Sequence, residues 1–365
     1  MSRKSASPVV TDGVRVAVDI GGTFTDLVSY DAREHVVRFE KSLSTPEALQ
    51  SAVMTCFDKA QVDIARLEHF IHGSTVAINT MLERSGARTA LITTRGFRDI
   101  YEIGRINRPD SFNLRHRKHA PLVERDLRFE VTERMLASGE VHAELVEAEV
   151  LAVIERLKTK HIQSVAVLFL HAYRNPTHER RVRELLRQHL PDAFVSISSD
   201  LSQEYREYER TSTIAANAYI GPRVSSYLTE IVDHLAAKKF AGGFLIVQST
   251  GGLYDADAAG RECIRMLESG PAAGVIATRD LCRRIGLQDA IAFDMGGTTA
   301  KSGVILRGDV MMTTTSMIGG YTEGLPVQIP MIDIQEVGTG GGSIARLAAG
   351  KSLRVGPQSA GSVPG

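Results

Sequence analysis

The sequence has no net charge and no long apolar run, and each absence excludes a class of protein. Lys plus Arg and Asp plus Glu both total 43 among 365 residues, so no global electric field attracts nucleic acid or an anionic membrane. No apolar run approaches the roughly 20 residues that a membrane-spanning helix needs. We therefore expect neither a nucleic-acid nor a membrane partner, and any phosphate site must depend on local geometry.

Cysteine is also scarce. Cys56, Cys263 and Cys282 are far apart and odd in number, which argues against a disulfide framework and favours a reducing, cytoplasmic setting. Residues 1–12 are polar and lack the apolar core of a secretory signal. We interpret them as a disordered leader.

The first half of the chain alternates short strands with helices. Residues 14–20, 24–30 and 36–41 predict an antiparallel meander, after which Thr45 is the expected N-cap of a helix that begins at Pro46. Further strands at 69–72, 89–93, 164–168 and 194–198 alternate with helices at 74–83, 147–158 and 176–188. This order predicts an α/β domain with a mixed sheet over residues 13–200.

A second domain is predicted over residues 201–365. It opens with a long helix at 209–235, either continuous or broken at Gly221-Pro222. Strands at 244–248, 290–294, 303–306 and 310–314 and a helix at 271–284 follow. The arginine-rich stretch 105–127 lacks periodicity and is interpreted as an ordered excursion or a rim loop.

Two segments match each other and carry the functional argument. Asp19-Ile20-Gly21-Gly22-Thr23 and Asp294-Met295-Gly296-Gly297-Thr298 each follow a buried strand and precede another strand. Such a match between distant segments indicates duplicated domains. A plain tight hairpin remains the alternative for a single copy, because glycine turns are common.

The motif suits a phosphate ligand. Paired glycines permit a sharp turn with positive φ and bring N–H groups close to an anion, and a threonine hydroxyl can donate to a phosphate oxygen. An aspartate fits beside phosphate when a hydrated Mg²⁺ lies between them. We expect Asp19 and Asp294 to organise Mg²⁺, and the phosphates to contact Gly21, Gly22, Thr23, Gly296, Gly297 and Thr298.

Several further blocks carry a family resemblance. They include residues 72–79, 86–94, 207–211, 248–252, 269–274 and 338–343. With these blocks the chain resembles the hydantoinase A/5-oxoprolinase family over about Val14 to Gly365. That family has the duplicated fold of actin, Hsp70 and sugar kinases, with ribonuclease H-like α/β domains.

The resemblance implies a subunit that hydrolyses ATP, with Mg²⁺, to open a cyclic amide such as a hydantoin or 5-oxoproline. An ATP-hydrolysing subunit of an acetone- or acetophenone-type ketone carboxylase is one alternative, and a non-catalytic nucleotide-binding module is another. The resemblance also implies a hydantoinase B-type partner in a hetero-oligomer. Relatives are about twice as long, so we expect the second domain to be truncated.

Other candidate residues keep two interpretations each. Asp26 is expected to orient the metal shell or act as a base, which makes Asp19, Asp26 and Asp294 the catalytic set. Lys301 stands where relatives often carry Asp, and contacts a phosphate, acidic neighbours or solvent. Gly340, Gly341 and Gly342 either donate N–H groups to phosphates or only permit a turn. His72 is a candidate base, and the basic run 105–118 contacts an acidic ligand or solvent.

Overall fold

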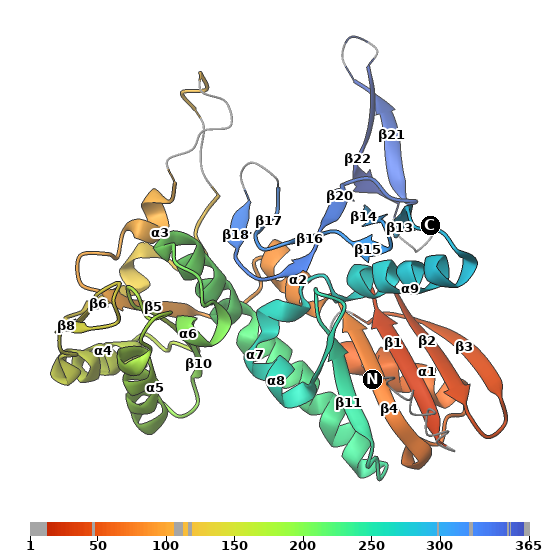
Figure 1. Cartoon of the computed structure of the whole chain (residues 1–365), viewed down its shortest axis with the longest axis horizontal. Coiled ribbons are helices and arrows are strands. Elements are labelled where there is room, and N and C mark those ends of the chain that lie inside the picture. The colour runs from red at the N-terminus through yellow and green to blue at the C-terminus, as the bar shows by residue number, and fades with distance from the viewer. Residues whose placement is uncertain are drawn as a thin grey trace, which may run out of the picture.

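The computed structural model describes residues 13–45, 48–105, 112–115, 119–297, 299–320, 324–348, 350 and 352–360. The expected leader, residues 1–12, lies outside them. Two lobes are joined by a long helix, and a third group of strands lies beside the first lobe (Figure 1). Within the described ranges, no helix combines the length and apolarity needed to cross a membrane.

The first lobe is built on a six-stranded mixed sheet in the order β12-β11-β4-β1-β2-β3. Its strands are β1 (Val14–Ile20), β2 (Phe24–Asp31), β3 (Val36–Leu43), β4 (Leu67–Ser74), β11 (Gly243–Val247) and β12 (Leu253–Asp255). The predicted meander of β1, β2 and β3 is confirmed, and β4 runs parallel to β1. The assignment of the 244–248 strand to the second domain is wrong, because β11 pairs in parallel with β4.

The two faces of β1 have different neighbours. Val16, Val18 and Ile20 are buried on one face, where helix α1 (Leu49–Lys59) packs and buries Cys56. Asp19 lies on the opposite face. Helix α1 begins later than predicted, with Ala48 at the N-cap and no side-chain cap, and Pro46 lies outside the described residues. The face that carries Val18 therefore packs into the core, whereas the face that carries Asp19 is available for a functional site.

The second lobe contains a parallel sheet in the order β10-β9-β5-β6. Three of its strands were predicted, while β6 and the small elements nearby were not. The elements are β5 (Thr89–Thr94), α3 (Ile100–Ile103), β6 (Arg128–Val131), β7 (Arg134–Met135), β8 (Val141–Ala143), α4 (Glu147–Thr159), β9 (Ser164–Leu168), α5 (Thr177–His189), β10 (Phe194–Ile197) and α6 (Ser198–Leu201).

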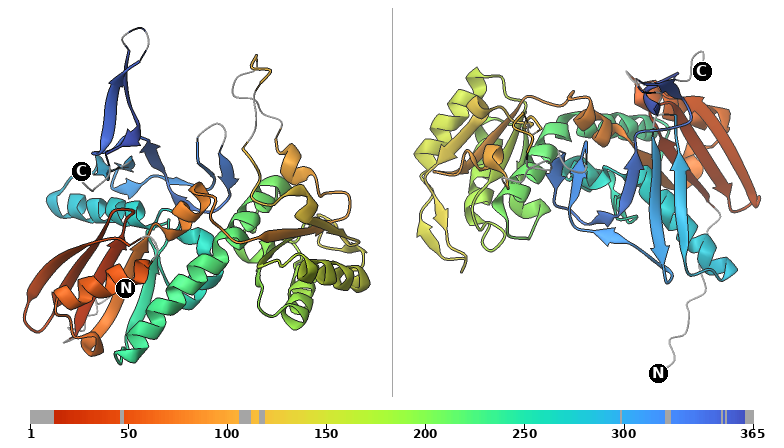
Figure 2. Two further views of the ribbon diagram at one scale, coloured as in Figure 1. Left: turned by 180° about the vertical axis from the view of Figure 1, so that it is seen from behind. Right: turned by 90° about the horizontal axis from the view of Figure 1, so that it is seen from above.

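Helix α7 (Glu207–Ala237) runs unbroken from the second lobe to the first (Figures 1 and 2). Pro222 lies inside it and supplies no N–H for the carbonyl of Ala218, four residues earlier. The hydroxyl of Ser164 on β9 donates to that carbonyl at 2.6 Å. A tertiary hydrogen bond thus replaces the missing helical one, so the expected alternative of a break is not realised.

The remaining elements follow α7. Helices α8 (Ala256–Arg261) and α9 (Ser269–Ile285) precede a sheet in which β14 pairs with β13, β15 and β20. The predicted 310–314 strand is divided in two. The strands are β13 (Ala290–Met295), β14 (Ala300–Leu306), β15 (Asp309–Val310), β16 (Met312–Thr313), β17 (Ser316–Ile318), β18 (Leu325–Val327), β19 (Met331–Ile332), β20 (Ile334–Val337), β21 (Ser343–Leu347) and β22 (Leu353–Ser359).

The two copies of the repeat differ in how they are covered. Ile291, Phe293 and Met295 on β13 correspond to the buried Val16, Val18 and Ile20 on β1, yet they are 69%, 65% and 53% exposed. Helix α9 packs on the other face of β13 and β14, against Ala292. In the part of the chain that the structure describes, the second copy therefore lacks the covering that α1 gives to the first.

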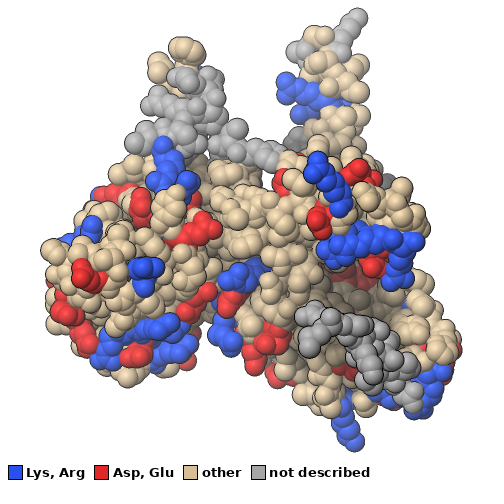
Figure 3. Space-filling model, viewed as in Figure 1, with Lys and Arg blue, Asp and Glu red and all other residues tan. Residues whose placement is uncertain are grey.

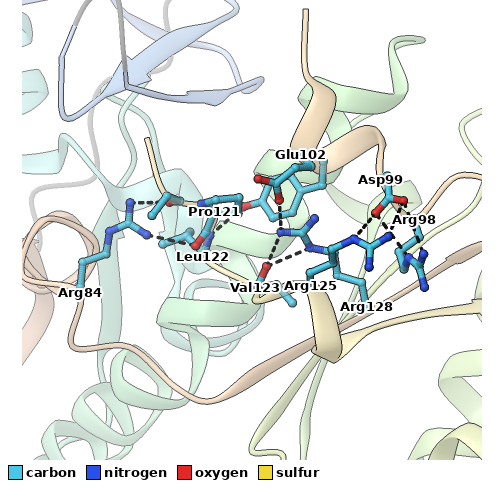
Figure 4. Close-up of polar contacts among 11 residues, drawn as sticks. Arg84, Arg98, Asp99, Glu102, Pro121, Leu122, Val123, Arg125 and Arg128 are labelled. Atoms are coloured by element: carbon cyan, nitrogen blue, oxygen red, sulfur yellow. Dashed lines mark hydrogen bonds and ion pairs between the residues drawn. The ribbon is translucent and has the colours of Figure 1, made fainter. Parts of the chain in front are cut away.

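Arginines anchor the described ends of the excursion 105–127 (Figure 4). The contacts run from Arg84 to the carbonyls of Ala120 and Pro121, from Arg128 to Val123 and Glu102, and from Arg125 to Asp99. Arg108, His116, Arg117 and Lys118 lie outside the described residues. On the face in Figure 3, acidic and basic side chains are interspersed, as the balanced composition predicts.

The position of β11 in the first sheet can be tested with a glycine pair. A Cβ on Gly242 would lie 2.4 Å from the carbonyl oxygen of Leu67, at the start of β4, whereas Gly274 inside α9 has nothing within 4 Å. We expect Gly242→Ala to destabilise the protein by about 1–3 kcal/mol, because backbone atoms must move. Gly274→Ala is the control and should be neutral or stabilising by up to about 1 kcal/mol. Thermal unfolding midpoints of both variants measure this, and equal midpoints would contradict the pairing.

Candidate functional site

The carboxylate of Asp19 is the point where three backbone segments meet. A Cβ built on Gly73, near the end of β4, would lie 2.6 Å from Asp19 Oδ1, and one on Gly270, at the start of α9, would lie 2.9 Å from the same atom. A side chain at either position would push the carboxylate out of its present place. The junction thus joins β1, β4 and α9 around one acidic side chain.

Ser269 fixes the beginning of α9 in this junction. Its hydroxyl accepts from the N–H of Ser74 and donates to the carbonyl of Ser74, both at 3.0 Å. Helix α9 has 17 residues, and the N-terminus of a helix favours negatively charged groups. The amino end of α9 therefore contributes a positive potential beside Asp19.

The two predicted hairpins have the same local structure. Gly21 N–H donates to the Phe24 carbonyl at 2.9 Å, and Gly296 N–H donates to the Thr299 carbonyl at 3.0 Å. The expected positive φ is wrong, since no glycine of either hairpin has one. The turns close without positive φ, and the space beside Gly22 is open, since a Cβ there would meet nothing within 4 Å.

The hairpins also face each other. A Cβ on Gly297 would lie 3.8 Å from the hydroxyl of Thr23, so the two turns approach across a narrow gap. Thr298, the matching threonine of the second hairpin, lies outside the described residues. The described parts of both copies are brought together as the repeat predicts.

Negative charge accumulates at this junction. Burial by the surrounding protein and the charges of Asp26 and Asp294 raise the pKa of Asp19 to about 6, against the opposing effect of Lys301. Asp19 nevertheless keeps part of its surface exposed. The negative charge at Asp19 suits a cation, and Mg²⁺ needs only one or two carboxylates because it keeps several waters. Among the described residues no cluster of three or more His, Cys, Asp or Glu side chains could hold a metal, so Asp19 and Asp294 remain predicted ligands.

Each sheet has a row of three charged residues on adjacent strands. In the first sheet Asp19 pairs across the strands with Asp26, and Asp26 pairs with Lys41, whose Nζ is 2.8 Å from the Asp26 carboxylate. In the second sheet the corresponding row is Asp294, Lys301 and Glu336. Each row has one net negative charge. The lysine is the third residue of the row in the first sheet and the second residue of the row in the second sheet.

Acidic neighbours hold Lys301. Its Nζ lies 2.7 Å from Glu268 Oε2 and 3.9 Å from Glu336 Oε2. Of the interpretations that the sequence left open, this geometry matches contact with acidic neighbours. A contact of Lys301 with a phosphate stays a prediction.

The glycine-rich segment at 340–342 supports the second hairpin. Gly341 and Gly342 donate their N–H groups to the carbonyls of Gly296 and Gly297, both at 2.9 Å, and Gly340 donates to the Ser343 hydroxyl at 2.8 Å. These three N–H groups are therefore used inside the chain. The segment therefore holds the second hairpin in place by hydrogen bonds, and these N–H groups are not available to a phosphate.

His72 is a core residue. It is fully buried, with Nδ1 at 3.0 Å from the Val18 carbonyl and Nε2 at 2.7 Å from the Tyr227 hydroxyl. Burial lowers its pKa to about 4, so it is neutral at physiological pH and lies away from the gap. The interpretation of His72 as a base is not supported by this position.

Sequence reasoning missed the residues that close the junction. Gly73, Glu268, Ser269 and Gly270 were noticed only as parts of blocks or not at all. The available signal was Ser269-Gly270-Pro271, a helix start immediately before an apolar helical pattern. Nothing in the sequence pattern placed that helix start against Asp19.

Comparisons with known proteins agree with this architecture. The model for the hydantoinase/oxoprolinase N-terminal region matches residues 15–190, and the model for hydantoinase/oxoprolinase matches residues 210–365. Caprolactamase subunit alpha of Pseudomonas jessenii is 33% identical over 96% of this chain and 51% of its own length. Acetophenone carboxylase gamma subunit of Aromatoleum aromaticum is 32% identical over 96% of this chain and 50% of its own length.

Two solved structures share the fold. The ATP-dependent caprolactamase of Pseudomonas jessenii matches with a TM-score of 0.80 and 31% identity over 96% of this chain and 52% of the other. Nucleotide-free acetone carboxylase matches with a TM-score of 0.81 and 25% identity over 96% of this chain and 51% of the other. The predicted fold class, duplicated actin-like α/β domains with mixed sheets, is confirmed.

This chain spans about half the length of the relatives named here. The two family models nevertheless cover most of the chain, one in each half. Together with the paired hairpins, these matches identify its family: the chain belongs to the hydantoinase/oxoprolinase family.

Proposed function

We propose that this chain is the nucleotide-binding part of an enzyme that uses ATP to activate and open a cyclic amide. The observation that carries the proposal is the approach of two equivalent Asp-X-Gly-Gly hairpins, with Thr23 facing Gly297 across the gap. A polyphosphate between them would contact both copies of the repeat. The names of the relatives, among them a caprolactamase subunit and an ATP-dependent caprolactamase structure, support ATP as the nucleotide and a cyclic amide as the acceptor.

The proposed reaction explains why ATP is used. An amide carbonyl is a poor electrophile, and transfer of a phosphoryl group to its oxygen creates a good leaving group. In that transfer the carbonyl oxygen forms a bond to the γ-phosphorus, the bond from phosphorus to the bridging oxygen breaks, and ADP departs with the electron pair. Water then adds to the activated carbon, and the ring C–N bond breaks as the nitrogen takes up a proton, which leaves an acyl phosphate. A second water hydrolyses that acyl phosphate to a carboxylate and free phosphate.

The described residues can be given roles in this scheme. The Gly21 N–H closes the turn on the Phe24 carbonyl, so the Gly22 backbone, the hydroxyl of Thr23 and the amino end of α9 would position the phosphates. Phosphoryl transfer depends mainly on positioning and charge neutralisation. Asp19 and Asp294 would hold a hydrated Mg²⁺, which supplies positive charge to the phosphate oxygens. Asp26 forms an ion pair with Lys41, and its negative charge would help to orient the shell of water around the metal.

A second candidate keeps the ATPase and changes the acceptor. Acetophenone carboxylase gamma subunit is nearly as similar in sequence to this chain as caprolactamase subunit alpha is, and the acetone carboxylase structure matches its fold as well as the caprolactamase structure does. In this scheme a ketone enolate or bicarbonate receives the phosphoryl group. The relatives are named as subunits, which supports a partner subunit, proposed to be of the hydantoinase B type, in either case.

Phosphate release separates the candidates. With Mg²⁺-ATP and the co-expressed partner, we expect a lactam to stimulate phosphate release about tenfold or more, because the acceptor completes the transfer. Asp294→Asn should abolish the stimulation, and Asp309→Asn, an exposed change on β15, should preserve it. Stimulation only by a ketone with bicarbonate would favour the carboxylase, and no stimulation despite bound nucleotide would favour a non-catalytic module.

The raised pKa of Asp19 predicts a pH-dependent stability. Folding raises this pKa from 3.8 to about 6, so the stability that protonated Asp19 contributes is present below pH 3.8 and is lost as pH rises through 6. Asparagine stays neutral at every pH. Without Mg²⁺, Asp19→Asn should therefore unfold at a higher temperature than the parent at pH 8 and at the same temperature near pH 4.

The control for this prediction is Asp309→Asn on β15, whose carboxylate is exposed and is not among the charges that shift the Asp19 pKa. It should not raise the unfolding temperature at pH 8. A midpoint for Asp19→Asn that is equal to or below the parent's at pH 8 would contradict the proposed electrostatic strain.

A further inference from the structure

A cavity of about 410 Å³ adjoins the candidate nucleotide site. Its walls come from α2 (Val76–Leu82), from the strands between β16 and β20, and from Glu268, the residue that precedes α9. This volume falls within the roughly 300–1,000 Å³ of small-molecule pockets. Figure 1 shows β16, β17 and β18 near α2, between the two lobes.

Glu268 lies between the cavity and the Asp19 junction. Its carboxylate accepts from Lys301 Nζ at 2.7 Å, and Gly270, two residues further along, lies close to the Asp19 carboxylate. Helix α2 makes the same connection, since it follows Gly73 and places Ile78 and Leu82 in the cavity wall. A molecule in the cavity would therefore lie next to the phosphates, as transfer between two bound reactants requires.

The described lining is apolar and acidic. Its charged side chains are Glu268, Asp333 and Glu336, and it contains neither Lys nor Arg. The apolar side chains are Ile78, Leu82, Met317, Ile318, Met331, Ile332 and Ile334. Such walls suit a small ring with an apolar body and hydrogen-bond donors.

Lys301 lies beside two of these carboxylates: its Nζ is 2.7 Å from Glu268 Oε2 and 3.9 Å from Glu336 Oε2. Asp333 accepts from the neutral amide of Gln335 at 2.8 Å. Burial, together with the charge of Glu336, raises the pKa of Glu268, which Lys301 opposes. A molecule in the cavity would therefore meet carboxylates and apolar side chains of the described lining.

We propose that this cavity binds the phosphoryl acceptor, and that its acidic lining selects a neutral cyclic amide over one that carries a carboxylate. This inference rests on the proposed function and refines its substrate class. The amide N–H can donate to a carboxylate of the wall, which is a strong type of hydrogen bond, while the ring packs on the apolar side chains. A carboxylate on the ring would face like charges, which is how a site rejects a near relative of its ligand.

Two lactams that differ only in this group provide the test. 2-Pyrrolidinone is neutral, and 5-oxoproline is the same ring with a carboxylate. Titration of the 365-residue chain by ligand-observed NMR, with Mg²⁺-ATP present, should show 2-pyrrolidinone binding about tenfold or more tightly than 5-oxoproline, because like charges oppose the second ligand. Equal affinities, or tighter binding of 5-oxoproline, would overturn the inference.

Variants locate the binding to the cavity. Leu82→Trp places a larger side chain in the wall and should weaken 2-pyrrolidinone binding about tenfold. Leu281→Trp is the control, since Leu281 on α9 has a similar exposure of 56% against 50% and does not line the cavity. Glu336→Gln should reduce the preference for the neutral ring. Unchanged lactam binding by Leu82→Trp would place the acceptor elsewhere and refute the assignment.

The nucleotide is measured in the same samples. Bound Mg²⁺-ATP without any binding of 2-pyrrolidinone would refute the cavity inference and leave the proposed function standing. Charge-selective lactam binding without bound nucleotide would support the cavity and refute the proposed function. The two failures are therefore distinguishable.

Discussion

The close contact between the Asp19 carboxylate and two glycine backbones determines the rest of the site. Gly73 and Gly270 come from different elements, and a side chain on either would displace the carboxylate. Their contact brings the end of β4 and the amino end of α9 to the first hairpin, while α9 carries the second hairpin on its flank. These contacts thus set the positions of the Asp19 carboxylate, the amino end of α9 and the two hairpins relative to one another.

Duplication has preserved the hairpins and changed their surroundings. The same turn hydrogen bond occurs in both copies, and each row of cross-strand charges has one net negative charge although Lys41 and Lys301 occupy different places. In its place Lys301 lies close to Glu268 and Glu336. That pairing lies between the Asp19 junction and the acidic cavity, and it gives the unusual lysine a structural reason.

Local patterns predicted the elements well, and tertiary contacts decided what the patterns could not. The meander, the α/β alternation and the paired hairpins follow from side-chain periodicity and glycine placement. The continuity of α7 could not be predicted, because it depends on Ser164 of a distant strand donating to the Ala218 carbonyl. The place of β11 beside β4 and the burial of His72 were missed for the same reason. The positive φ expected of the hairpin glycines was wrong because the turn closes without it.

The central claim is that Asp19 and Asp294 act on one bound Mg²⁺-nucleotide. A calorimetric titration of Mg²⁺-ATP into the parent chain, Asp19→Asn, Asp294→Asn and the double variant tests this most directly, because a double-mutant cycle reports whether two residues share a ligand. We predict that each single change weakens binding about tenfold or more, and that the double variant binds only slightly more weakly than the singles. Two results would contradict a shared site: a double variant whose loss of Mg²⁺-ATP affinity is the product of the two single losses, or a single variant that binds as tightly as the parent.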